Sequence, residues 1–125
     1  MLSTKSTDAR ILDGMKMVTR LLQDKRFTEQ IANIYSFDMC DMSPSALVAY
    51  LQRHLERETV EVATFRPFNP WSGAMAMYTP KHPDRVALSS RRLTRNTYST
   101  FRNAASIAGS IIHEIIHLLN NLIKE

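Results

Sequence analysis

Several sequence features that would assign the chain to a specialised class of protein are missing. Its one cysteine, Cys40, excludes an intramolecular disulfide and a zinc knuckle built from cysteines. No run of 18 or more apolar residues is present, so we expect no transmembrane helix and no membrane partner. The segment Met1–Asp8 lacks the apolar core of a secretory signal peptide. We therefore expect a cytoplasmic protein, with non-classical secretion left open.

The composition is that of an ordinary globular domain. The chain has 125 residues, of which 44% are hydrophobic and 22% charged. Internal repeats and low-complexity tracts are absent. We expect residues 1–125 to form one domain, and we leave open whether it is a fragment of a longer catalytic domain.

The net charge of +4 is partly concentrated in one segment, which holds Arg91, Arg92, Arg95 and Arg102. A basic cluster of this kind can bind phosphates or an acidic partner. No nucleic-acid-binding motif accompanies it, so we favour a solvated surface and do not expect a nucleic-acid partner. A basic partner-binding protein remains one alternative reading of the chain.

The N-terminal half predicts helices. Residues 8–35 carry apolar side chains at steps of three and four, with Asp8 as the N-cap and a break near residues 24–28. Ser43 and Pro44 predict the start of a second helix that runs to about Glu58. Between the two helices we expect a loop. It contains Asp38, Cys40 and Asp41, which we interpret as turn residues rather than a metal cluster.

The second half predicts a small sheet followed by a long helix. Residues 59–66, 74–78 and 85–89 are short apolar or alternating segments separated by turn residues. Because the connections are short, we expect an antiparallel sheet. From residue 98 or 99 to about Asn120 we expect one helix, with a closely packable surface of small residues where the sheet crosses it. The fold class predicted is therefore α+β.

That last helix contains the motif on which the functional prediction depends, H-E-x-x-H. His113 and His117 lie four residues apart, so on a helix both imidazoles leave the same face about one turn apart. At this spacing two ring nitrogens can bind one Zn²⁺. Glu114 projects beside the pair, where a general base would reach a water without binding the metal. The alternative is a buried amphipathic helix with two hydrogen-bonded histidines.

At these residues the sequence resembles the zincin metallopeptidases. The motif and its apolar flanks carry the resemblance closely, and residues 59–119 carry it loosely. It implies the N-terminal half of a zincin catalytic domain, with Zn²⁺ held by His113 and His117. It also implies peptide-bond hydrolysis by a metal-activated water, with Glu114 as general base. An edge strand near Met75–Tyr78 would bind a peptide or protein substrate by strand pairing.

The sequence departs from that family at the third zinc ligand. Zincins take it from downstream of the motif, and here eight residues follow His117. If the helix continues, Glu125 lies about 12 Å beyond His117 along the axis. It could approach the metal only if the helix broke at Asn120 and Asn121. His54, His82 and Cys40 have no surrounding pattern that identifies them as ligands.

We therefore predict a zinc-dependent peptidase of α+β fold, with Glu114 as the catalytic residue and His113 and His117 as metal ligands. The main alternative is a catalytically silent binding or partner-interaction domain that keeps the motif helix for packing. The sequence leaves the third ligand, the substrate and the oligomeric state open.

Overall fold

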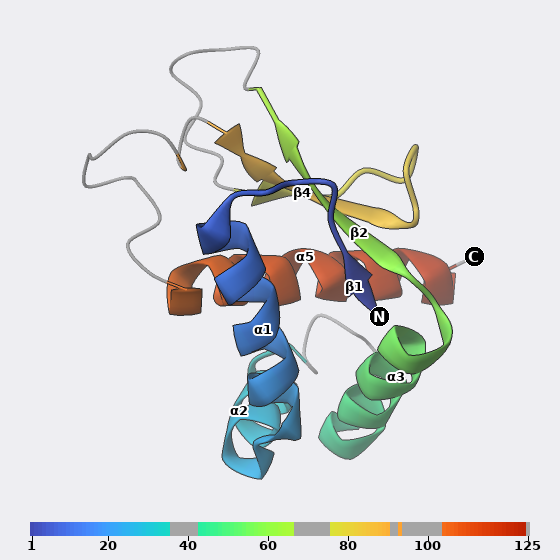
Figure 1. Cartoon of the computed structure of the whole chain (residues 1–125). Helices are drawn as coiled ribbons and strands as arrows, with labels where there is room; N and C mark the ends of the chain where they lie inside the picture. The colour runs from blue at the N-terminus through green and yellow to red at the C-terminus, as the bar shows by residue number, and fades with distance from the viewer. Residues whose placement is uncertain (36–42, 67–75, 91–92, 94–103, 125) are drawn as a thin grey trace.

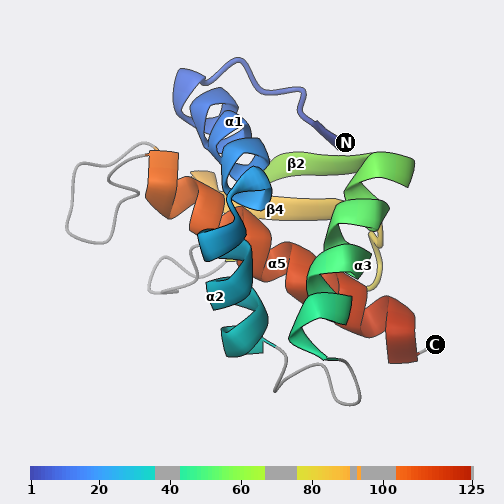
Figure 2. The same ribbon diagram turned by 90° about the horizontal axis from the view of Figure 1, so that it is seen from below.

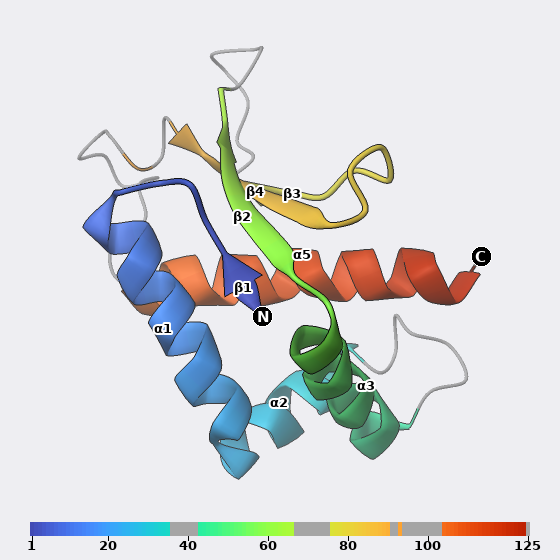
Figure 3. The same ribbon diagram turned by 45° about the vertical axis from the view of Figure 1, so that its right-hand side comes forward.

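The chain folds into a small sheet and a set of helices that lie on either side of one long C-terminal helix (Figure 1). The computed structural model describes residues 1–35, 43–66, 76–90, 93 and 104–124. The sheet lies on one side of the long helix, and two N-terminal helices, α2 and α3, lie on the other side (Figures 1 and 3). The mixed α+β class predicted from the sequence is confirmed.

Helices α1 (Ala9–Gln23) and α2 (Lys25–Tyr35) replace the single interrupted helix of the prediction. Asp8 caps α1, since its side chain accepts a hydrogen bond from the backbone N–H of Arg10. The expected break falls at Asp24. Its backbone is extended, and its carboxylate accepts from the N–H of Arg26 at 2.9 Å. Asp24 thus ends one helix and caps the next.

Helix α3 (Pro44–Arg57) begins and ends where the sequence predicts. The Ser43 hydroxyl accepts from the N–H of Ala46 at 3.2 Å, and Pro44 occupies the first turn. Leu47 and Leu51 are fully buried. Helix α3 packs against α2, and Figure 2 shows both helices crossing over the long helix from below.

Four strands form one sheet in the order β1-β2-β4-β3, with bounds β1 (Leu2–Ser3), β2 (Val60–Phe65), β3 (Ala76–Met77) and β4 (Arg85–Ser89). The expectation of an all-antiparallel sheet is wrong. Strands β2 and β4 are parallel, as are β1 and β2, and only β3 and β4 form an antiparallel pair.

The reason for the parallel pair is the length of the connection between β2 and β4. Residues 66–84 exceed the dozen or so that a parallel connection needs, and β3 lies within them. Strand β3 lies at the edge of the sheet, and a turn in which His82 N–H donates to the carbonyl of Thr79 leads from it to β4. Strand β4 is thereby placed between its two neighbours.

Helix α5 (Ala104–Lys124) carries the motif and much of the core. It packs against α1 on one side and against β4 and β3 on another. The expected closely packed surface of small residues, Ala104, Ala105, Ala108 and Gly109, is not formed as predicted, because Ala105 and Gly109 are exposed. The close approach to α5 is made by α1, where Gly14 lies against the side chain of Ile107 and near the backbone of Ala108. Gly109, by contrast, faces open space.

The helix also continues past Asn120 and Asn121 to Lys124, so the expected end at Asn120 is wrong. The asparagines do not break it, and the break that would have allowed Glu125 to approach His117 does not occur. The predicted start, at residue 98 or 99, lies outside the described residues.

Strand β1 was not predicted. Leu2 pairs with Val60, and the N–H of Val60 donates to the carbonyl of Met1 at 2.8 Å. The amino group of Met1 donates to the carbonyls of Leu55 and Glu58 at the C-terminal end of α3. A strand of two residues is too short to show an alternating pattern in the sequence. Its extended conformation depends on its pairing with β2.

Within the described part of the chain, no helix combines the length and the apolar character that crossing a bilayer requires.

Candidate metal centre

The three motif side chains lie on α5, which around the motif is exposed to solvent on one face and buried on the others. The apolar residues around the motif are between 0 and 3% exposed: Ile111, Ile112, Ile115, Ile116, Leu118 and Leu119. His113 and His117 are exposed on the remaining face. Burial of the flanks therefore fixes the rotation of α5 and leaves both imidazoles accessible to a ligand.

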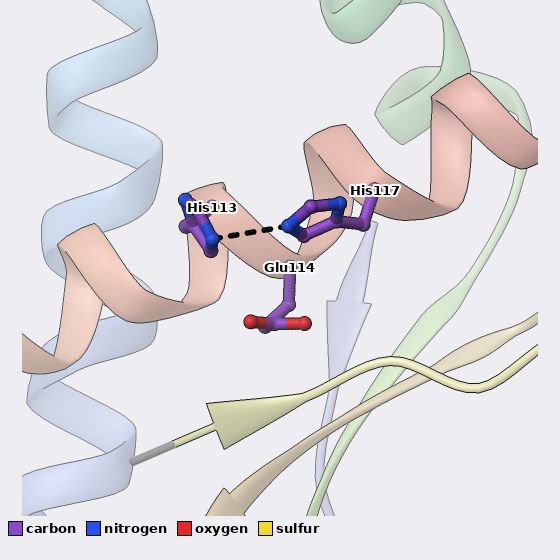
Figure 4. A group of neighbouring side chains, drawn as sticks. All are labelled: His113, Glu114 and His117. Carbon is purple, nitrogen blue, oxygen red and sulfur yellow. Dashed lines mark hydrogen bonds between the residues drawn. The ribbon is translucent and has the colours of Figure 1, made fainter. Parts of the chain in front are cut away.

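The two imidazoles converge. Nε2 of His113 and Nε2 of His117 lie 3.0 Å apart, and the rings meet edge to face with centroids 4.6 Å apart (Figure 4). Two nitrogens bound to one tetrahedral zinc at 2.0–2.1 Å would be about 3.3–3.4 Å apart. The observed separation is close to that value. The pair is thus arranged so that one ion, or one shared proton, can lie between the nitrogens.

Glu114 occupies a different environment from the histidines. Its side chain projects from α5 toward β3, and the residue is only 9% exposed (Figure 4). Burial raises the pKa of the Glu114 carboxyl, against the opposing effects of His117, His113 and a hydrogen bond from the backbone of Tyr78. Tyr78 directly follows β3, so the edge strand and the motif helix meet at this carboxylate.

Together His113, Glu114 and His117 form a group that can bind a metal ion, with one ligand atom from each residue and all three atoms within 4.8 Å of one another. Nitrogen and carboxylate donors in this combination suit zinc and neighbouring transition metals. The residues predicted from the sequence as the site are therefore brought together.

None of the other described ligand-type residues joins this group. His54 lies on α3, where burial lowers its pKa and Glu58 opposes the change. His82 lies exposed in the turn before β4. The segment with Asp38, Cys40 and Asp41, the arginine cluster and Glu125 lie outside the described residues.

A hollow of about 390 Å³ adjoins the motif and was not predicted from the sequence. Besides Glu114 and His117, it is lined by the last residue of β3, by residues that follow β3, and by residues in the last turns of α5: Met77, Tyr78, Pro80, Asn120 and Asn121. Asn121 donates through Nδ2 to the Tyr78 hydroxyl at 3.4 Å. The sequence contained one indication that Asn121 lies near the motif: it follows His117 by four residues, and residues at this spacing share one face of a helix.

The larger hollow, about 680 Å³, lies elsewhere, between α1 and α3, with β1 at its side. Its floor is apolar, with Val18 and Leu22 among the lining residues. Size alone would favour it as a binding site. The metal-ligating group and its convergent polar atoms adjoin the smaller hollow, which we take as the candidate site for that reason.

Comparison of the chain with protein-family models, with curated proteins and with solved structures gave no match.

Proposed function

We propose that this chain is a zinc-dependent peptidase that holds Zn²⁺ through His113 and His117 and uses Glu114 as general base. The observation that carries the proposal is the 3.0 Å approach of the two Nε2 atoms on an accessible helix face, with a buried carboxylate beside them. Two exposed histidines gain little from each other as a pair. An ion bound between the two nitrogens would add a stabilising interaction that the pair alone lacks.

Glu114 has the properties that a general base needs. It is adjacent to the imidazoles, and burial raises its pKa above the ordinary value for a glutamate, which makes the carboxylate a stronger base. The hydrogen bond from the backbone of Tyr78 orients its carboxylate. When bound, zinc would supply Lewis acidity, which makes water a nucleophile at neutral pH and polarises a peptide carbonyl.

Strand β3 supports a peptide as substrate. It lies at the edge of the sheet, it is paired on one side with β4, and α5 packs against it. An edge strand presents backbone N–H and C=O groups with which an extended peptide can pair. Because Glu114 projects toward β3, a peptide paired there would lie beside the general base (Figure 4).

A second candidate function is a zinc-binding domain without catalysis. The composition of the metal-ligating group favours this second function, because in the described part of the chain the group consists of two histidines and one carboxylate. A catalytic zinc normally has three protein ligands and one open position. If Glu114 bound the metal as the third ligand, no base would remain for the reaction.

The test compares Glu114→Gln with His113→Ala and His117→Ala. We expect Glu114→Gln to retain zinc while proteolysis of an unfolded protein substrate falls by roughly 10²–10⁴-fold. Both histidine variants should lose zinc as well as activity. Equal loss of zinc in all three variants would make Glu114 a ligand and support the domain without catalysis.

A further inference from the structure

The larger hollow, between α1 and α3, is bounded by one face of each helix. Its volume is about 680 Å³, and β1 lies at its side (Figure 1). The lining residues recur at steps of three and four along both helices, among them Leu12, Met15 and Thr19 on α1 and Gln52, Leu55 and Glu56 on α3. Each helix therefore presents a continuous stripe of side chains to the hollow.

The packing of the helices fixes the shape of this hollow. Helix α1 packs against α5 and α2, and α3 packs against α2. The side chain of Gln52 on α3 donates to the carbonyl of Leu22 on α1 at 2.9 Å, which links the two walls. In the floor, Val18 is 1% exposed and Leu22 is 9% exposed. A partner could therefore bind without first separating the helices.

Apolar side chains project at the edge of the hollow. Met1 and Leu12, which both line it, are 70% and 40% exposed. Met1 is held in place by its backbone, because its carbonyl accepts from the N–H of Val60 at 2.8 Å. Among the other large hydrophobic residues that the structure describes, only Met77 is comparably exposed. Exposed apolar side chains gathered around an apolar hollow are typical of a surface that binds a partner.

The described lining residues carry one charged side chain of each sign. Lys16 lies on α1 and Glu56 on α3, so the charges are on opposite walls, and both residues are exposed. Within the described part of the chain, neither takes part in an ion pair. A ligand with a single charge would be attracted by one wall and repelled by the other. A complementary partner would place an anion near Lys16 and a cation near Glu56.

A second copy of this chain meets that requirement. A two-fold axis that passes through the hollow between Lys16 and Glu56 places α1 of each copy opposite α3 of the other. Lys16 of each copy then faces Glu56 of the other, and two ion pairs form by symmetry. The same rotation brings the projecting Leu12 of each copy against the apolar lining of the other. The surface is thus complementary to itself in charge and in apolar character.

We therefore infer that the hollow between α1 and α3 is a dimerisation surface, on which a second copy of this chain docks about a two-fold axis with Lys16 and Glu56 paired across the interface. Burial of the exposed apolar side chains would drive the association, and the two charges would fix its orientation. The inference is independent of the proposed function, because His113, Glu114 and His117 do not line this hollow.

Sedimentation equilibrium of the purified full chain tests the inference. EDTA is present throughout, so that no metal can link the exposed imidazoles of two copies. We expect the mass to rise from one chain toward two between about 1 and 500 µM, as a micromolar interface requires. Lys16→Glu and Glu56→Lys each place like charges opposite each other twice in the interface. Each should raise the Kd of the dimer at least about tenfold.

The double variant, Lys16→Glu with Glu56→Lys, restores both ion pairs with their signs exchanged. Its Kd should return to within about threefold of the unaltered chain, a recovery that damage to the fold cannot produce. The matched controls are Lys81→Glu and Glu29→Lys, which make the same charge changes at exposed positions outside the hollow. Both should leave the Kd unchanged.

Leu12 tests the apolar part of the interface. Leu12→Glu would place a charge against the apolar lining of the other copy and should raise the Kd at least about tenfold, because a charge without a partner is costly to bury. Leu12→Met keeps an apolar side chain of similar volume and should keep the Kd within about threefold. Circular dichroism shows whether each variant has the helix content of the unaltered chain.

Three results would overturn the inference. The first is a mass that stays at one chain up to about 500 µM. The second is a dimer whose Kd is the same in Lys16→Glu, Glu56→Lys and the unaltered chain, because its interface would lie on another face. The third is a monomer that binds a fluorescent fatty acid and loses that binding in Leu12→Glu, which would assign the hollow to a small apolar ligand.

Discussion

Gly14 of α1 lies directly against Ile107 of α5. A Cβ atom built on Gly14 would be 2.4 Å from Cγ2 and 2.9 Å from Cβ of Ile107, closer than carbon atoms approach without movement. Ile107 is 1% exposed and precedes His113 by six residues on the same helix. The absence of a side chain at Gly14 therefore sets how closely α1 approaches the helix that carries the metal-ligating group.

We predict that Gly14→Ala destabilises the protein by up to about 2 kcal/mol. Overpacking of a core typically lowers the free energy of unfolding by about 1–3 kcal/mol. Replacing a glycine in a helix with alanine raises it by about 1 kcal/mol, because alanine is the better helix former. The branched Ile107 side chain cannot swing away easily, because the core encloses it. Denaturant unfolding at a single pH measures the change in the free energy of unfolding.

Gly109→Ala is the matched control for that substitution, because it makes the same change in a helix where no described atom outside the helix's own backbone lies within 4 Å of the new Cβ. It should stabilise the protein by about 1 kcal/mol. If both variants changed stability by the same amount, the close approach of α1 to Ile107 would be refuted.

Zinc should stabilise the folded chain. A metal that binds only the folded state adds about 2.7 kcal/mol to the free energy of unfolding at a zinc concentration 100 times the Kd. His117→Ala should remove this gain, because one of the two converging nitrogens is lost. His82→Ala, in the exposed turn, should keep it. Thermal unfolding with and without Zn²⁺ measures the effect, and a Tm that zinc leaves unchanged would argue against the site.

The affinity for zinc should be lower than that of structural zinc sites. Two histidine nitrogens leave more positions to water than three or four protein ligands do, so we expect a Kd above roughly 0.1 µM. Proteolysis by this chain should accordingly be weak. Isothermal titration gives the Kd, and His54→Ala should not change it, because His54 is outside the metal-ligating group. A nanomolar Kd would show that the chain supplies a further ligand.

The cap of α1 should make stability depend on pH. Through a side-chain hydrogen bond, Arg10 holds the pKa of the Asp8 carboxyl below its usual value of 3.8. A carboxyl with a lowered folded pKa contributes stability above its unfolded pKa and loses it as pH falls through the folded value. At pH 7, Asp8→Ala should cost about 1 kcal/mol, and the difference should shrink below about pH 4.

Asp8→Asn tests whether the charge is responsible for that pH dependence. An asparagine keeps an oxygen that can accept from the N–H of Arg10, but it does not titrate. Its stability relative to Asp8→Ala should stay constant from pH 7 to pH 3. A pH dependence equal to that of the unaltered protein would assign the effect to other carboxyl groups.

The elements that could be predicted from the amino-acid sequence are those whose signals are local. Asp8, Ser43 and Pro44 mark helix starts because caps and first-turn prolines act on backbone groups within a few residues. The alternation in residues 59–66 identified β2 for the same kind of reason. The i, i+4 spacing of His113 and His117 placed their imidazoles together once the segment was helical.

The relationships between segments that are distant in sequence became known only from the three-dimensional structure. Whether β2 and β4 run parallel depends on the path of the connection between them, and β1 is a strand because β2 is beside it. No local pattern in the sequence indicates that Gly14 faces Ile107, or that Tyr78 contacts both Glu114 and Asn121. These contacts arise from the packing of whole elements, which depends on burial summed over many residues rather than on any local pattern.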